Sequence, residues 1–139
     1  MNPIDEIRSR LSGHSLIRLN EQKNFIEAVP NTVEGFSVSL VNEGNQFTVT
    51  YDNGWHEHFE SAEDALNCFG FGLSEKCRLK IRLAGSLAYK WTVEYSEEDR
   101  WFEDSTTGLM FFPFWRRRHT LYRRNQITTR ELGDEWKVR

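Results

Sequence analysis

The chain has 139 residues and a formal net charge of −3; 38% of its residues are hydrophobic and 14% are aromatic. This composition fits one domain with a core of few, large rings, and it excludes a disordered, collagen-like or disulfide-rich chain. No apolar run approaches the roughly 20 residues that span a bilayer. The first residues lack the apolar segment of a signal peptide, so we expect a cytoplasmic protein.

The chain opens with a pattern typical of a short helix. Asn2 before Pro3 reads as an N-cap followed by proline at the first helical position. Ile4, Ile7 and Leu11 recur at helical spacing, so we predict a helix over residues 1–13. Residues 14–35 show no clear pattern, and a strand over residues 25–29 is one interpretation.

Residues 36–60 alternate between apolar and polar side chains and predict a first three-stranded antiparallel meander. A three-residue loop at 52–54, with Gly54 left-handed, pairs Tyr51 with Trp55 and keeps apolar residues on one face. The same register leaves Glu57 on that apolar face, beside Val49. Ser61 then offers an N-cap for a helix over 61–73, which we expect Gly70 and Gly72 to end.

Residues 78–127 predict a second meander and late strands, and the tail 131–139 has no strong pattern and is expected to fray. A loop at 84–86 pairs Leu79 with Trp91, and a loop at 96–100 pairs Tyr95 with Trp101. This places most rings of the chain on one inward face: Phe36, Phe47, Tyr51, Trp55, Phe59, Tyr89, Trp91, Tyr95 and Trp101.

The two meanders resemble each other, as FTVTY at 47–51 and WTVEY at 91–95 show. An internal duplication is one interpretation, and convergence of similar hairpins is the other. We predict a single α+β domain over residues 1–139. Its antiparallel sheet consists of two βββ meanders packed on a central helix, with a short N-terminal helix.

The opposite face of the predicted sheet is polar. In the second meander it carries Arg78, Lys80, Arg82 and Lys90, and the predicted register sets Lys80 opposite Lys90. Like charges that face each other across strands cost stability unless an anion compensates. This face is therefore a candidate binding surface for a small anionic ligand or another protein; the alternative is a solvated outer face, common in antiparallel sheets.

The C-terminal part is basic, since residues 115–139 hold eight of the 18 Lys and Arg residues and three acidic ones. Aromatic residues at 111–115 directly precede a run of arginines, so a second candidate surface comprises Trp115, Arg116, Arg117 and Arg118. Rings beside arginines can stack on bases while the guanidinium groups hold phosphates. The other interpretation is a core strand with a solvated basic rim.

Metal and catalytic chemistry have weaker support. His56 and His58 share one face of a strand, but a zinc site needs at least a third ligand, so they are weak candidates and no metal is predicted. Cys68 and Cys77 are interpreted as buried free thiols. No catalytic or cofactor motif is present, so we expect neither an enzyme nor a cofactor.

These patterns predict a small non-catalytic binding or protein-interaction module. Nucleic-acid binding through the basic aromatic segment 111–124 is the alternative. Nothing in the sequence indicates a membrane partner. Long edge strands favour pairing with another chain unless they are capped, so a homodimer is a further hypothesis.

Overall fold

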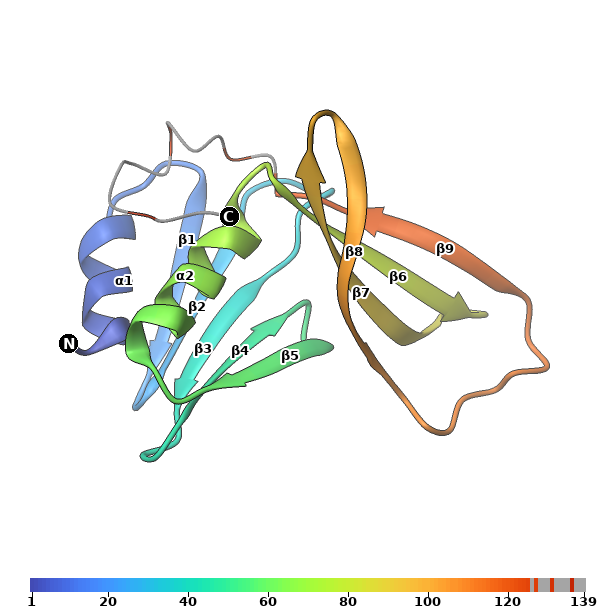
Figure 1. Ribbon diagram of the computed structural model, residues 1–139, viewed down its shortest axis with the longest axis horizontal. Helices are drawn as coiled ribbons and strands as arrows, with labels where there is room; N and C mark the ends of the chain where they lie inside the picture. The colour runs from blue at the N-terminus through green and yellow to red at the C-terminus, as the bar shows by residue number, and fades with distance from the viewer. Residues whose placement is uncertain (126, 128–130, 132–135, 137–139) are drawn as a thin grey trace.

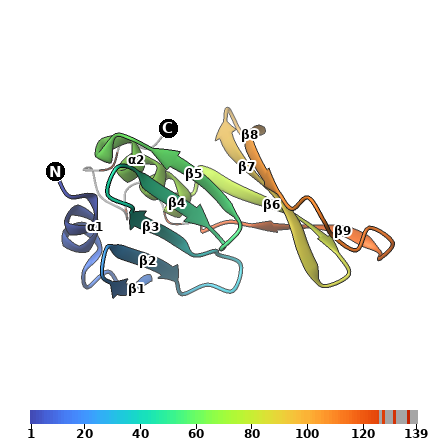
Figure 2. The ribbon, with the colours of Figure 1, turned by 90° about the horizontal axis from the view of Figure 1, so that it is seen from below.

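The computed structural model describes residues 1–125, 127, 131 and 136. Among these residues the fold is α+β, with two helices and two antiparallel sheets of five and four strands. Figure 1 shows both helices on one face of the five-stranded sheet and the four-stranded sheet projecting to its side, and Figure 2 shows the same arrangement from below. The predicted class is confirmed. No described helix is long and apolar enough to cross a membrane.

Helix α1 spans Pro3–Leu11, as the capping pattern predicts. The Asn2 side chain accepts a hydrogen bond of 3.0 Å from the Ile4 N–H, which satisfies a backbone donor that has no partner within the helix. Ile4, Ile7 and Leu11 are buried against the first sheet.

The first sheet has the strand order β1-β2-β3-β4-β5 and is antiparallel throughout. Tyr51 pairs with Trp55, and Glu57 lies opposite Val49, so the predicted register is confirmed. The strand interpreted at 25–29 exists, and its partner β1 was not predicted. The strands are β1 (Ile17–Gln22), β2 (Phe25–Pro30), β3 (Val38–Asn42), β4 (Phe47–Tyr51) and β5 (Trp55–Phe59).

The turn between β4 and β5 has a different conformation from the predicted one. Asp52 and Asn53 are left-handed, with φ of 57° and 53°, and Gly54 is not. Gly54 is needed for close packing instead, because a Cβ there would lie 2.1 Å from the Trp91 ring. The turn is thus a contact point for the second sheet.

Helix α2 spans Ala62–Leu73, and Ser61 caps it by accepting the Asp64 N–H at 3.3 Å. The prediction that Gly70 and Gly72 end the helix is wrong, since both lie inside it. A Cβ at Gly70 would lie 2.3 Å from Trp136, and one at Gly72 would lie 2.5 Å from the Tyr51 ring. Packing, not chain termination, therefore requires these glycines.

The second sheet has the strand order β8-β7-β6-β9, so the predicted second meander is present and a late strand is added beside its first strand. The hairpins turn more tightly than predicted, because Ala84 pairs with Leu87 and Glu97 pairs with Arg100. The strands are β6 (Cys77–Ala84), β7 (Leu87–Glu97), β8 (Arg100–Gly108) and β9 (Arg118–Arg123).

The tighter turns and two β-bulges change the predicted register of the second sheet. Leu79 pairs with Val93 instead of Trp91, and Tyr95 pairs with Phe102 instead of Trp101. The predicted like-charge pair of Lys80 with Lys90 is also wrong, because Thr92 lies opposite Lys80, and Lys90 lies opposite Arg82.

The first bulge and the tighter turn between β7 and β8 also move rings between faces. Tyr89 is the extra residue of the first bulge, and Trp101 pairs with Ser96. Neither ring joins the main core cluster, so the prediction that both lie on the inward face is wrong. Tyr51 and Trp55 of the first sheet and Trp91 of the second belong to that cluster, as predicted. The resemblance between the meanders therefore holds along β4 and β7 and fails at Trp101. Duplication and convergence both stay open as interpretations.

Asn125 connects three distant segments. Its side-chain Nδ2 donates to the Gly72 carbonyl at 2.8 Å, and its Oδ1 accepts the Phe36 N–H at 2.8 Å. Asn125 is 2% exposed, so both hydrogen bonds are shielded from water. The predicted frayed tail, 131–139, lies outside the described residues apart from Glu131 and Trp136, and the Trp136 ring stacks on Phe69 with centroids 6.3 Å apart.

Candidate functional site

The outer face of the second sheet, which points away from the main core, carries a depression of about 480 Å³. All four strands contribute, because alternate residues of each strand point to this side. We call it the basic depression. Its lining residues are Lys80, Arg82, Tyr89, Lys90, Thr92, Glu103, Thr106, Arg118, Thr120 and Tyr122.

The charge of the basic depression is strongly unbalanced. Lys80, Arg82, Lys90 and Arg118 line it, and Glu103 is its only described carboxylate. Glu103 forms an ion pair with Lys80 at 3.6 Å but is itself largely exposed. The other three cations form no ion pair within 4.0 Å with any described residue. The depression therefore presents a net positive field to a ligand.

Hydroxyl groups hold the floor of the depression in place. Arg82 donates a hydrogen bond to the Thr120 hydroxyl from the neighbouring strand. The hydroxyls of Thr92 and Thr106 lie 2.9 Å apart across β7 and β8. Because these groups stand on paired strands, the cations are positioned by rigid backbone, and the hydroxyls add donors for an anion's oxygen atoms.

Tyr89 reaches the depression because the bulge redirects its side chain. Its ring stacks on Phe112, with centroids 4.0 Å apart and planes within 6°. Burial by itself would raise the pKa of Tyr89, but hydrogen bonds and the positive charges of Arg82 and Arg118 outweigh it, so the pKa is lowered. The two guanidinium groups thus favour negative charge at this point of the surface.

Arg78 lies on the same face but does not line the depression. Its guanidinium donates to one carboxylate oxygen of Glu94 at 2.6 and 2.8 Å. It also stacks on Trp101 and Tyr122, with its central carbon 4.5 and 4.2 Å from the ring centroids. Its charge is thus paired with Glu94, and two rings pack on its guanidinium group. Arg124 covers Trp101 as well, at 4.9 Å.

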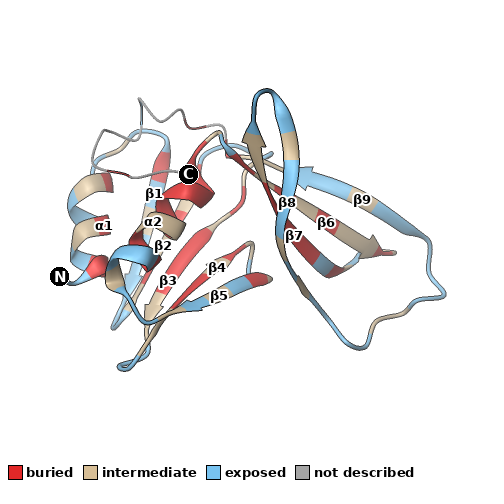
Figure 3. Cartoon of the chain, viewed as in Figure 1, coloured by how far each residue is buried: buried red, intermediate tan, exposed pale blue. Residues whose placement is uncertain are grey.

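Residues 109–117, which we call the aromatic loop, connect β8 to β9 and carry the second predicted surface. The side chains are solvent-exposed: Met110 by 89%, Phe111 by 88%, Trp115 by 72% and Phe114 by 64%. The interpretation as a core strand is therefore wrong. Figure 3 shows this loop as mostly exposed chain at the far end of the second sheet. Arg116 and Arg117 belong to the loop, and Arg118 opens β9.

The weak metal candidates lie elsewhere, on the first sheet. The rings of His56 and His58 are 5.5 Å apart, and His58 Nδ1 lies 2.7 Å from the Thr48 hydroxyl. Among the described residues, no group of three or more His, Cys, Asp or Glu could hold a metal. The prediction that both cysteines are buried thiols is confirmed for Cys77, while Cys68 is only partly buried.

The structure thus brings Lys80, Arg82, Lys90 and Arg118 together and leaves Arg78 outside. Sequence reasoning missed Tyr89 and Glu103. Tyr89 depends on a bulge that no residue pattern indicated, and Glu103 faces outward because the turn between β7 and β8 is tighter than predicted. The alternation of Arg118, Thr120 and Tyr122 could have been read as one face of a strand.

Comparison with known proteins adds no constraint on function, since no protein-family model, curated protein or solved structure matches the chain.

Proposed function

We propose that the protein is a non-catalytic interaction module that binds an acidic segment of a partner protein in the basic depression. The observation that carries this proposal is the convergence of four cations from three strands against one carboxylate. Isolated like charges repel, and an incoming carboxylate relieves that repulsion while accepting hydrogen bonds from lysine, arginine and threonine.

The aromatic loop supports a protein partner over a small anion. Phe112 stacks on Tyr89, so the exposed apolar side chains are continuous with the basic depression. Trp, Phe, Met and Arg are enriched where proteins bind one another, and a charged surface beside an apolar one suits a segment carrying both kinds of residue.

The direct test is the affinity for a labelled acidic peptide containing two phenylalanines, measured by fluorescence anisotropy. Reversing Lys80 and Lys90 to Glu is expected to weaken binding about tenfold or more, because like charges then face the peptide. The matched control reverses Arg18 and Lys23, two exposed cations of the first sheet and its hairpin. Undetectable binding by the unmodified protein, or equal loss in both double variants, would count against the proposal.

Single-stranded nucleic acid is the second candidate, favoured by the exposure of Phe111, Phe114 and Trp115 beside Arg116 and Arg117. Such rings can stack on bases. A salt titration against oligo(dT) and oligo(U) separates the candidates: the interaction module shows no affinity near physiological salt. The rival shows a steep salt slope and loses affinity when Trp115 is changed to Ala.

A homodimer remains a hypothesis for the edges of the sheets, where β9 and β8 of the second sheet have one paired side each. Size-exclusion chromatography with light scattering gives the mass directly.

A further inference from the structure

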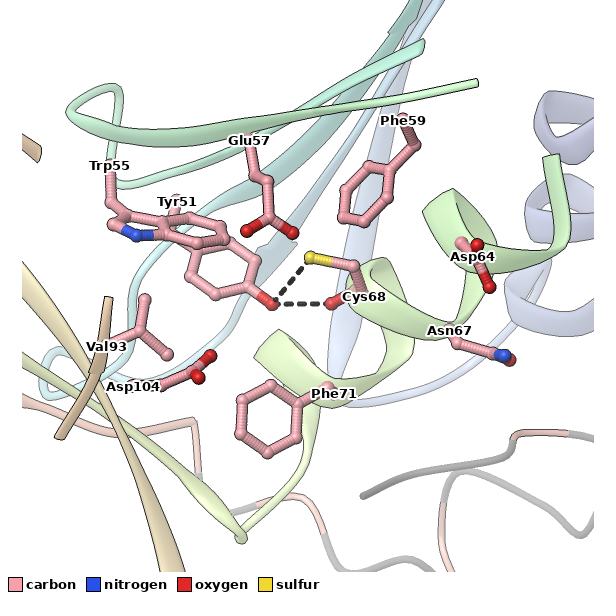
Figure 4. A pocket seen from close by; sticks show the side chains of 10 residues that line it. All are labelled: Tyr51, Trp55, Glu57, Phe59, Asp64, Asn67, Cys68, Phe71, Val93 and Asp104. Carbon is pink, nitrogen blue, oxygen red and sulfur yellow. Dashed lines mark hydrogen bonds between the residues drawn. The ribbon is translucent and has the colours of Figure 1, made fainter. Parts of the chain in front are cut away.

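A separate cavity of about 330 Å³ lies where α2 and β5 meet the second sheet. Figure 4 shows its walls, which are mainly the rings of Tyr51, Trp55, Phe59 and Phe71. The volume falls at the lower end of the range of about 300–1,000 Å³ for small-molecule sites, and apolar walls with few polar groups are their usual lining.

Glu57 places a carboxylate among these rings. It lies between Trp55 and Phe59 on β5, where the residues at alternate positions point toward the helix and His56 and His58 point away. In Figure 4 its carboxylate points into the cavity, toward Cys68. Glu57 is half-buried. The residue that breaks the apolar alternation of the first meander is therefore the one that gives the cavity a negative group.

Asp104 approaches the same cavity from the second sheet. It is the extra residue of the second bulge, since Val93 pairs with Ser105 and Glu94 pairs with Glu103. Its carboxylate points into the cavity from the side of Val93. A regular strand, β5, and a bulge in β8 thus bring one carboxylate from each sheet to a single aromatic-walled space. None of the described residues that line it is Lys, Arg or His.

We infer that this cavity binds a small organic ammonium ion, with its charge between Glu57 and Asp104 and its apolar part against the rings. Aromatic faces attract cations through their quadrupole, and the two carboxylates add direct electrostatic attraction. A bare metal ion is a poorer fit, since no described group of three His, Cys, Asp or Glu side chains could coordinate one. The site is independent of the basic depression, which has the opposite charge.

The test is a titration of the ¹⁵N-labelled protein with phenethylammonium, followed by the indole N–H signal of Trp55, which donates to Ser105 at 3.0 Å. The neutral match is 2-phenylethanol, which keeps the ring and chain and lacks the charge. Phenethylammonium is expected to bind at least about fivefold tighter than the alcohol, since the carboxylates act on charge alone.

The variants Glu57→Gln and Asp104→Asn each keep shape and remove one negative charge. Each is expected to weaken phenethylammonium binding about fivefold and to leave the alcohol unaffected. Glu60→Gln is the matched control, an exposed carboxylate beside β5 that does not line the cavity. The inference is overturned if phenethylammonium gives no saturable shift, if the alcohol binds equally tightly, or if Glu60→Gln weakens binding as much as Glu57→Gln.

Discussion

The indole of Trp91 rests on Gly54 so closely that a Cβ at position 54 would stand 2.1 Å from the ring. Trp91 belongs to β7 and Gly54 to the turn between β4 and β5, so this contact joins the two sheets. Trp91 Nε1 also donates to Asp52 of the same turn at 3.3 Å. One side chain therefore packs on, and hydrogen-bonds to, a single turn of the neighbouring sheet.

The first prediction follows from this contact. Gly54→Ala is expected to lower the free energy of unfolding by about 1–3 kcal/mol, because the added methyl group displaces the Trp91 ring. Gly108→Ala is the matched control, since its nearest neighbours would be 3.6 Å away, an ordinary contact. Urea unfolding measures both. Equal stability of the two variants would show that the sheets do not pack through this turn.

The second prediction concerns pH. Burial raises the pKa of Asp52 above its ordinary value of 3.8, and the Trp91 hydrogen bond and Arg123 oppose that rise only in part. The unfolded chain therefore loses this proton at lower pH than the folded protein. The free energy of unfolding therefore decreases as pH rises from about 4 to the raised pKa of Asp52. Above that pKa the decrease from this group is complete and stays constant.

Asp52→Asn removes this titration and keeps an oxygen that accepts the Trp91 N–H. Relative to the unmodified protein, the variant is expected to gain stability as pH rises through that window and then to hold a constant advantage. Urea unfolding at intervals from pH 3.5 to 7 measures the difference. Parallel stability curves for the two proteins would contradict the prediction.

The third prediction separates Arg78 from the cations of the basic depression. Arg78→Met leaves Glu94, only 6% exposed, without its partner and is expected to cost about 3 kcal/mol of stability. Adding Glu94→Gln should recover part of that loss. Lys80→Met removes an exposed ion pair and should cost less than about 1 kcal/mol. Equal effects of Arg78→Met and Lys80→Met would argue against this distinction.

The fourth prediction concerns the aromatic loop. Changing Phe111, Phe114 and Trp115 together to Ser is expected to change stability by no more than about 0.5 kcal/mol, because these side chains are exposed. Phe112→Ser should cost about 1 kcal/mol or more, since it loses the stack on Tyr89. Chemical denaturation compares the two. A large loss in the triple variant would mean that its rings pack on the body of the protein.

The register of the first meander could be predicted, because its alternation is regular and one face is buried. Tyr51 and Trp55 must both be inside, and only one register allows that. The position of the second meander in the sequence could be predicted, but the pairing register of its strands could not. Each bulge shifts the parity by one residue, and nothing in the residues around Tyr89 or Asp104 distinguishes a bulge from continuous pairing.

The candidate site could likewise be predicted where its strands are regular and not elsewhere. Lys80, Arg82 and Lys90 share a face because their strands are regular there, so alternation was sufficient to group them. Arg78 has the same parity, but Glu94 neutralises its charge and Trp101, whose face the sequence misassigned, stacks on it. The prediction that Gly70 ends the helix was wrong for a related reason. Local propensity favours ending a helix at glycine, but the glycine is required here by the ring of Trp136, more than 60 residues away in the sequence.

The hydrogen bonds of Asn125 bear on the order in which the molecule folds. Phe36 and Gly72 lie early in the chain, and the side chain that satisfies them is 89 and 53 residues away. During synthesis, the strands of the first sheet and helix α2 precede Asn125 in the chain. Until Asn125 is present, the Phe36 N–H and the Gly72 C=O lack this hydrogen-bond partner. Closure of such long loops slows folding. We therefore expect these two hydrogen bonds to form late in folding, after residue 125 has been synthesised.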